Sequence, residues 1–237
     1  MKHTALLVVT SHDETSESGH ETGFDFQEVA AIYIRLREAG LAVRFASPKG
    51  GKPSANSSST DSFERSGAVD LFLGDARAVA ALSDTATLGD VDATRFDALI
   101  LAGGPGALHD FASDSTLARL AGTLWDRGAI VSGIGCGIAG LLGARRHDGL
   151  PLLAGKSLTG PVAAELTEMG AAQSDAAVNL PGSLAESTMT CTHGPPGEPY
   201  VVSDGRLITG QNAASASELA LQILDAIDAF PREAATA

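Results

Sequence analysis

The residues with the clearest chemical potential lie in the stretch SGIGCGIAGLL, which runs from Ser132 to Leu142 after an apolar segment. Its small residues allow the sharp strand-to-helix turn that presents a nucleophile in many α/β enzymes. A helix N-terminus at this turn would lower the pKa of the Cys136 thiol and place backbone N–H groups near an oxyanion. A small buried cysteine that packs the start of a helix would give the same pattern. The local sequence leaves Cys136 equally open to both interpretations.

A second glycine turn, AGGPG at residues 102–106, follows another apolar run. The N–H of Gly104 could bind an oxyanion, whereas Pro105 has no N–H to donate. The alternative is a turn that only ends a strand. The turn lacks the full GxGxxG pattern and the acidic residue about 20 positions later, so it does not predict a dinucleotide site.

Glu28 and His109 are candidates for proton transfer. Glu28 falls in the first turn of a predicted helix, beside the apolar Val29. Burial there would raise the pKa of its carboxyl and suit general acid or base catalysis. The alternative is a solvated carboxylate that the helix dipole stabilises. His109 follows the glycine turn and could reach the same site, with a surface position as the alternative. No histidine has HxH or HExxH spacing, so the sequence predicts no zinc site.

Alternating strands and helices must position these residues. The segment from Phe26 to Gly40 has apolar residues at i, i+3, i+4 and i+7, which indicates a helix. We expect strands at residues 5–10, 41–47, 96–104 and 129–134, and helices at 114–128 (N-capped by Asp114 or Ser115), 136–146, 163–171 and 214–230. This alternation predicts an α/β fold with a doubly wound parallel sheet, whose site lies at the carboxyl ends of the strands.

Residues 48–67 are rich in Ser, Gly and Pro and predict a surface loop, which a weakly helical stretch follows. We interpret residues 48–92 as an insertion within a single domain that spans residues 1–237. Residues 149–160 predict a short hairpin or strand pair. Asp204-Gly205 predicts the tight turn of a later hairpin.

The overall composition excludes several classes of function. The chain has 237 residues, a formal net charge of -13 and no cluster of Lys and Arg, so we expect neither a nucleic acid nor a membrane as a partner. Its two cysteines form no disulfide framework and suit a reducing cytosol, which predicts a cytoplasmic protein. No window approaches the ~20 apolar residues of a membrane span. A small-molecule substrate is the expected ligand.

Several motifs together resemble the ThiJ/PfpI superfamily, which has the class I glutamine amidotransferase-like fold, and within it the glyoxalase III-like and heat-shock-chaperone-like branch. The motifs span nearly the whole chain: TGFDFQEVA, FASPKGGKP, the insertion that leads to GGPGALHDF, GKSLTG and VVSDGRLITGQNAAS. The resemblance implies a flavodoxin-like three-layer sandwich, a homodimer, and a cofactor-free site with an elbow cysteine, a following histidine and an acid from the first helix. Glu28 matches that acid, Glu165 a further acid near the histidine, and Gly104 the glycine of the oxyanion hole.

The elbow departs from the family pattern, which reads roughly I-C-H-G-P-A. This chain has IGCGIA at residues 134–139, where Gly137 and Ala139 set the register. Gly135 therefore takes the place of the nucleophile, and Cys136 takes that of the histidine. Glycine relaxes a strained backbone turn at no steric cost. We expect the Cys136 thiol to point away from the usual attack position.

Three functions are compatible with this sequence. The first is an enzyme without a covalent cysteine, in which Glu28 is the general acid and base and the N–H groups of Gly104 and Cys136 hold an oxyanion. It would hydrate, dehydrate, isomerise, or open and close a ring in a small carbonyl-containing metabolite. The second is glyoxalase III-like or hydrolase activity with Cys136 as the nucleophile. The third is a non-catalytic binding or chaperone-like protein. A retained carboxylate beside a missing nucleophile favours the first.

Overall fold

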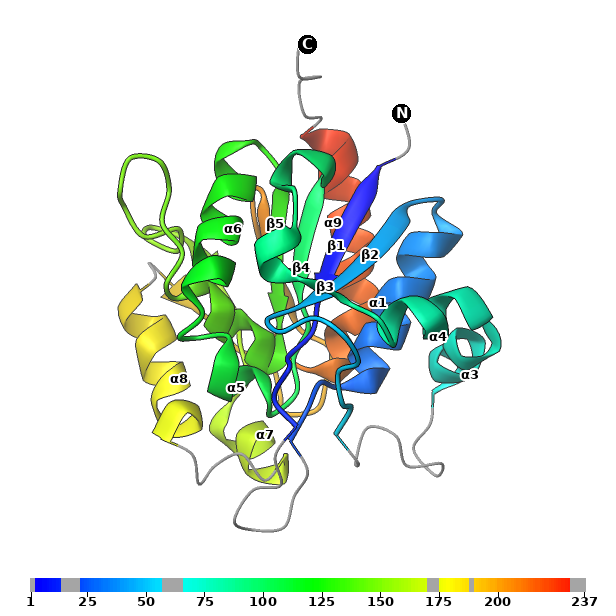
Figure 1. Cartoon of the computed structure of the whole chain (residues 1–237). Helices are drawn as coiled ribbons and strands as arrows, with labels where there is room; N and C mark the ends of the chain where they lie inside the picture. The colour runs from blue at the N-terminus through cyan, green and yellow to red at the C-terminus, as the bar shows by residue number, and fades with distance from the viewer. Residues whose placement is uncertain (1–2, 14–21, 57–65, 170–174, 188–189, 231–237) are drawn as a thin grey trace.

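A seven-stranded sheet forms the centre of the molecule (Figure 1). The structure, a computed structural model, describes residues 3–13, 22–56, 66–169, 175–187 and 190–230. The strands of this sheet are β1 (Thr4–Val8), β2 (Ala42–Ser47), β3 (Ala86–Thr87), β4 (Ala98–Leu101), β5 (Ile130–Ile134), β8 (Val201–Asp204) and β9 (Leu207–Gly210). Their order is β3-β2-β1-β4-β5-β9-β8, and the described pairs are parallel except for the antiparallel pair of β8 and β9.

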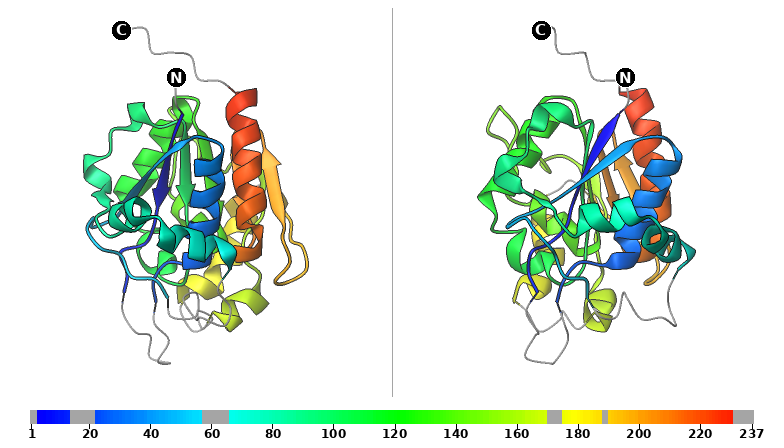
Figure 2. Two further views of the ribbon diagram at one scale, coloured as in Figure 1. Left: turned by 90° about the vertical axis from the view of Figure 1, so that its right-hand side faces the viewer. Right: turned by 45° about the vertical axis from the view of Figure 1, so that its right-hand side comes forward.

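Helices cover both faces of the sheet, which makes three layers (Figures 1 and 2). Helices α1 (Phe26–Glu38) and α9 (Ala216–Ala229) lie side by side on one face, and α6 (Ser115–Asp126) lies on the other. The remaining described helices are α3 (Gly67–Gly74), α4 (Ala76–Leu82), α5 (Ala107–Asp110), α7 (Ala163–Glu168) and α8 (Asp175–Ser187), with short 3₁₀ helices η1 (Leu88–Asp90), η2 (Ala93–Arg95), η3 (Gly135–Leu141) and η4 (Ala213–Ser215).

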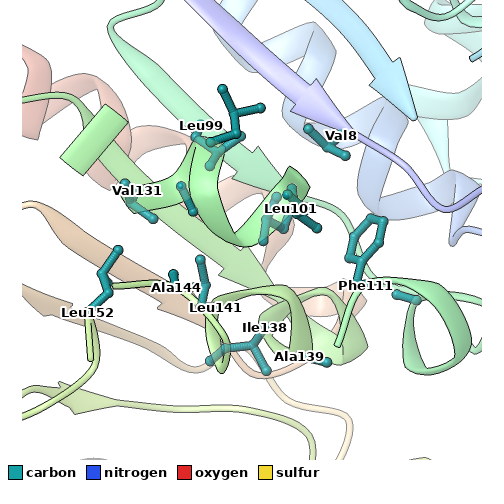
Figure 3. Packing of buried hydrophobic residues seen from close by; sticks show 14 of the residues in the cluster. Val8, Leu99, Leu101, Phe111, Val131, Ile138, Ala139, Leu141, Ala144 and Leu152 are labelled. Atoms are coloured by element: carbon teal, nitrogen blue, oxygen red, sulfur yellow. The ribbon is translucent and has the colours of Figure 1, made fainter. Parts of the chain in front are cut away.

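The two faces of the sheet bury separate hydrophobic clusters. Along β1, Leu6 and Val8 belong to the cluster beneath α6, and Ala5 and Leu7 belong to the cluster beneath α1 and α9. Burial on both faces explains why the central strands are continuous apolar runs rather than alternating ones. Figure 3 shows part of the α6 cluster, in which η3 supplies residues such as Ile138 that pack near β4.

Most of the predicted elements are confirmed, and with them the flavodoxin-like sandwich. Helix α1 begins at Phe26 and ends just before Gly40, whose φ is +86°. Asp114 caps α6 by accepting hydrogen bonds from two backbone N–H groups. Asp204-Gly205 joins β8 to β9 in an antiparallel hairpin. Local capping and turn chemistry therefore determines these boundaries.

Three elements differ from the predictions. The hairpin at residues 149–160 is wrong, because β6 (Ser157–Leu158) instead pairs in parallel with the distant β7 (Thr190–Cys191). The helix expected after β5 is the 3₁₀ helix η3, where a Cβ on Gly137 would lie 2.3 Å from the Leu101 carbonyl oxygen. The backbone of η3 thus passes so close to the end of β4 that only glycine fits at position 137. Helix α8 was not predicted, since Pro181 interrupts its pattern.

The insertion predicted at residues 48–92 contributes α3, α4 and β3 in its described part, and β3 extends the sheet by pairing with β2. Ala55 of the insertion pairs with Phe24, which lies just before α1. In the described part of the chain, no helix is long and apolar enough to cross a membrane.

The carboxyl ends of four strands meet at one edge of the sheet. Thr10, Gly103, Gly135 and Gln211 follow β1, β4, β5 and β9, which are adjacent in that order. The chain leaves β1 towards β2 on one side and later returns to β4 on the other. Such a change of direction opens the crevice in which ligands bind in doubly wound sheets.

Candidate active site

Asp25 fixes the start of helix α1 and therefore the place of Glu28. Its Oδ1 atom accepts hydrogen bonds from the N–H groups of Gln27, at 2.9 Å, and Glu28, at 3.1 Å. An aspartate at this position satisfies N–H groups that the helix itself leaves without acceptors. Because Glu28 is the third residue of the helix and buried, its side chain points into the strand-end crevice.

The carboxyl group of Glu28 bridges the turns that follow β4 and β5. Its Oε2 atom accepts a hydrogen bond of 2.7 Å from the N–H of Gly103. Its Oε1 atom faces Gly135, because a Cβ built on that glycine would lie only 2.9 Å from it. The structure thus brings the predicted acid to the predicted position of the missing nucleophile.

The surroundings of Glu28 favour its protonated form. Burial raises the pKa of this carboxyl well above its ordinary value, and the negative charges of Asp25 and Glu165 act in the same direction. The Gly103 N–H acts in the opposite direction without reversing the shift. Since Oε2 accepts a hydrogen bond, a proton on this group lies on Oε1, the atom that faces Gly135.

Gly135 has the left-handed backbone conformation of a nucleophile elbow. Its φ is +51°, at the junction between β5 and η3. Other residues pay a steric penalty in this conformation, whereas glycine adopts it freely. The turn therefore keeps the elbow shape, while its apex presents bare backbone to the Glu28 carboxyl.

Cys136 lies behind the elbow, fully buried in the hydrophobic cluster beneath α6. Burial raises the pKa of its thiol, and the carboxyl groups of Glu28, Asp25 and Glu165 raise it further. The thiol is neutral and inaccessible, which argues against Cys136 as a nucleophile. Its N–H belongs to the first turn of η3, where backbone donors have no acceptor within the helix.

Only glycine fits at position 104, because the turn after β4 packs closely against the segment that precedes α1. Its φ is +106°, and a Cβ there would lie 2.4 Å from the Gly23 carbonyl oxygen. The neighbouring Gly103 carbonyl oxygen accepts a hydrogen bond of 3.0 Å from the Asp25 N–H. Within the described ranges, the Gly104 N–H donates to no protein acceptor. A role for this donor in binding an oxyanion remains a prediction.

Glu165 is the centre of a separate hydrogen-bond cluster. Its Oε1 accepts hydrogen bonds from Gln211, Asn212 and the N–H of Gly197, at 3.0, 2.7 and 3.0 Å. Burial opposes ionisation, but these hydrogen bonds outweigh it and hold the pKa of Glu165 below its usual range. No histidine among the described residues donates to it. In the part of the chain that the structure describes, Glu165 is therefore not hydrogen-bonded to a histidine, as the predicted role would require.

Gln211 is the residue at this edge that the sequence reasoning missed. It directly follows β9, whose Gly210 pairs with Ile134, so Gln211 and Gly135 leave the sheet side by side. Its fully buried amide bonds Glu165 and the backbone of Gly194. A polar residue immediately after a predicted central strand was the available signal.

His109 lies at the exposed end of α5, and its ring stacks on that of His12. The ring centroids are 4.1 Å apart, and Nδ1 of His12 lies 2.8 Å from the Thr22 hydroxyl. The backbone of His12 also approaches Gly106 in the β4 turn. The histidine pair is thus placed beside that turn, with no described contact to Glu28.

A cavity of about 520 Å³ lies between the start of α1 and the insertion. Its walls are mainly apolar and include Phe24, Phe26, Val69 and Phe72. Glu28 and Gly135 are not part of its lining. Among the described residues, no group of three or more His, Cys, Asp and Glu side chains could hold a metal ion.

Comparison with known proteins identifies the family. The model of the DJ-1/PfpI family matches residues 20–226. The chain belongs to the DJ-1/PfpI family. This agrees with the ThiJ/PfpI resemblance of its motifs and with the mostly parallel sheet between two helix layers.

Relatives within the DJ-1/PfpI family include proteins named as glyoxalases. The chain is 28% identical over 229 residues to the glutathione-independent glyoxalase HSP31 of Saccharomyces cerevisiae, covering 94% of this chain and 97% of the relative. Its structure matches that of glyoxalase III from Candida albicans with a TM-score of 0.85, at 25% identity and with 94% and 97% of the two chains covered. These relatives support the glyoxalase III-like branch.

A third relative matches over a shorter stretch. The chain is 33% identical over 136 residues to the human glutamine amidotransferase-like class 1 domain-containing protein 1. The match covers 57% of this chain and spans only 61% of the human protein's length.

Proposed function

We propose that this DJ-1/PfpI protein is an enzyme that acts on a small carbonyl-containing metabolite by general acid and base catalysis, without a thiol at the elbow. The observation that carries the proposal is the Glu28 carboxyl, buried and held by Gly103, which faces the bare backbone of Gly135. Relatives named as glyoxalases support the substrate class.

The chemistry follows from a buried carboxyl group whose pKa is raised well above its ordinary value. Glu28 can give its Oε1 proton to a carbonyl oxygen as negative charge develops there, and the carboxylate can then accept a proton from the adjacent carbon or from water. Proton transfers of this kind isomerise, hydrate or dehydrate a carbonyl compound without a covalent intermediate. The N–H groups of Gly104 and Cys136 would stabilise the oxyanion.

The test compares Glu28→Gln with Cys136→Ala on a panel of small aldehydes and α-oxoaldehydes, with carbonyl consumption as the readout. Glutamine keeps an acceptor for the Gly103 N–H but cannot transfer a proton. We expect Glu28→Gln to abolish turnover and Cys136→Ala to retain much of it. Full turnover in Glu28→Gln would refute the proposal, and loss confined to Cys136→Ala would support the thiol mechanism instead.

We further propose that the protein is a homodimer, as the family resemblance implies. Sedimentation equilibrium at micromolar concentration tests this directly. A single species of 24.0 kDa would contradict it.

A further inference from the structure

The second cysteine of the chain lies beside a histidine. Cys191 is the last residue of β7, is half-buried, and pairs with Leu158 of β6. Its Sγ lies 3.6 Å from Nε2 of His193, which is exposed. No described contact joins the pair to Glu28, and nothing in the proposed mechanism uses it.

The orientation of His193 makes Nε2 the basic atom of the ring. Nδ1 lies 3.2 Å from the carbonyl oxygen of Gly160. A carbonyl oxygen can only accept a hydrogen bond, so Nδ1 must carry the proton. In the neutral imidazole Nε2 then has a free lone pair, and it faces the Cys191 thiol. The Cys191 thiol faces a base, His193 Nε2, and the Gly160 carbonyl oxygen orients that base. This is the arrangement that activates a thiol as a nucleophile.

The segment that carries the pair is held on both sides of His193. The Thr192 N–H donates to the Leu158 carbonyl oxygen at 3.0 Å, and the Gly194 N–H donates to Oε1 of Gln211 at 2.8 Å. The Tyr200 hydroxyl donates to that of Thr192 at 3.1 Å. Fixed neighbours limit the rotation of the peptide groups on either side, which preorganises the imidazole against the sulfur.

We propose that Cys191 and His193 form a thiol centre that adds reversibly to small aldehydes. Partial burial raises the pKa of the Cys191 thiol, so the thiol keeps its proton until a base removes it. In contrast to Cys136, which is fully buried, Cys191 has an exposed base beside it. This inference does not depend on the role proposed for Glu28.

The addition needs no other reactant. Sγ forms a bond to the carbonyl carbon while Nε2 of His193 takes the thiol proton, and the π electrons of the C=O bond move to oxygen. Nε2 then returns the proton to that oxygen, which gives a neutral hemithioacetal. The reverse path releases the aldehyde. The inference is confined to aldehydes, because their addition reaction needs no leaving group.

The first experiment measures alkylation of the native, full-length protein by iodoacetamide at neutral pH, with peptide mass mapping of both cysteines. We expect Cys191 to react and Cys136 to react only after denaturation. His193→Asn should slow alkylation of Cys191 at least about tenfold, since the base is removed. His147→Asn is the matched control, because His147 is an exposed histidine that contacts Asp126 instead. Equal Cys191 rates in the wild type and in His193→Asn would overturn the proposal.

The second experiment tests reversibility on wild-type protein, so this result does not depend on how a variant folds. Brief exposure to methylglyoxal should protect Cys191 from iodoacetamide, and desalting should restore its reactivity. Absence of protection, or protection that desalting does not reverse, would contradict a reversible adduct. Glu28→Gln should show the same protection as the wild type, so failure of this proposal is distinguishable from failure of the proposed function.

Discussion

Oε1 of Glu28 lies only 2.9 Å from the position that a Cβ on Gly135 would occupy. The buried acid and the elbow apex are therefore in direct contact range, with no side chain between them. This relationship depends on two local features: the left-handed backbone at Gly135, and the aspartate cap that starts α1 three residues before Glu28.

Gly135→Ala should destabilise the protein and disturb Glu28. The left-handed conformation costs a non-glycine residue about 1–2 kcal/mol, which lowers the melting temperature by roughly 2–8 °C in a chain of this size. The new methyl group would also displace the carboxyl, so turnover should fall. Gly149→Ala is the matched control, because its φ is +81° but no atom lies within 4 Å of the added Cβ. Equal effects of both variants on turnover would contradict the contact.

The pH dependence of stability should report the raised pKa of Glu28. In the unfolded chain this carboxyl ionises near 4.5, whereas in the folded protein it keeps its proton to higher pH. Above about pH 4.5 the unfolded state therefore binds fewer protons than the folded state, and the free energy of unfolding falls as pH rises. Glu28→Gln removes this titration. Urea denaturation from pH 4.5 to 8 should show a steeper loss in the wild type, and parallel curves would refute the shift.

Asp25→Ala should show that the helix cap of α1 supports turnover as well as stability. Loss of a helix cap costs about 1 kcal/mol, and here it also frees the first turn that positions Glu28, so turnover should fall together with stability. Asp114→Ala removes an equivalent cap from α6, where the aspartate also accepts hydrogen bonds from two N–H groups. Thermal melts should show similar losses for both variants. An equal fall of turnover in Asp114→Ala would mean that general destabilisation is responsible.

Gln211→Met should loosen the segment around Gly194 while nearly preserving side-chain volume. The change removes the hydrogen bonds of the amide to Glu165 and to the Gly194 backbone, at a cost of about 1–3 kcal/mol. Faster hydrogen exchange at the Gly194 amide is the expected signature. Gln222→Met on the surface of α9, whose amide bonds Glu218, should leave that exchange rate unchanged.

Local signals in the sequence predicted the elements around the site but not its assembly. Apolar runs and caps located α1, β4 and β5, because these depend on neighbouring residues. The burial of Glu28 depends on tertiary packing, so the sequence left it open between a buried acid and a solvated one. The Cys191–His193 pair escaped prediction for a similar reason, since a backbone carbonyl from Gly160 orients its base.

The parallel pairing of β6 with β7 shows the same limitation. Residues 149–160 contain turn signals and favour a hairpin on local grounds, yet the partner strand begins at Thr190. The segment between them includes α7 and α8, whose packing no local pattern encodes. Long-range contacts, rather than the local propensity of residues 149–160, therefore determine the partner of β6.

The position of β9 has a consequence for the order in which this protein folds. β9 inserts between β5 and β8, and its pairing partner β5 ends more than 70 residues earlier in the chain. Contacts across such long sequence separations form slowly, because a large loop must close before they contribute. Gln211 follows β9 and joins Glu165 to Gly194, so a chain still emerging from the ribosome lacks this cluster until β9 has been synthesised. We therefore expect the edge of the sheet beside the elbow to mature late, and only in a chain whose C-terminal hairpin has docked.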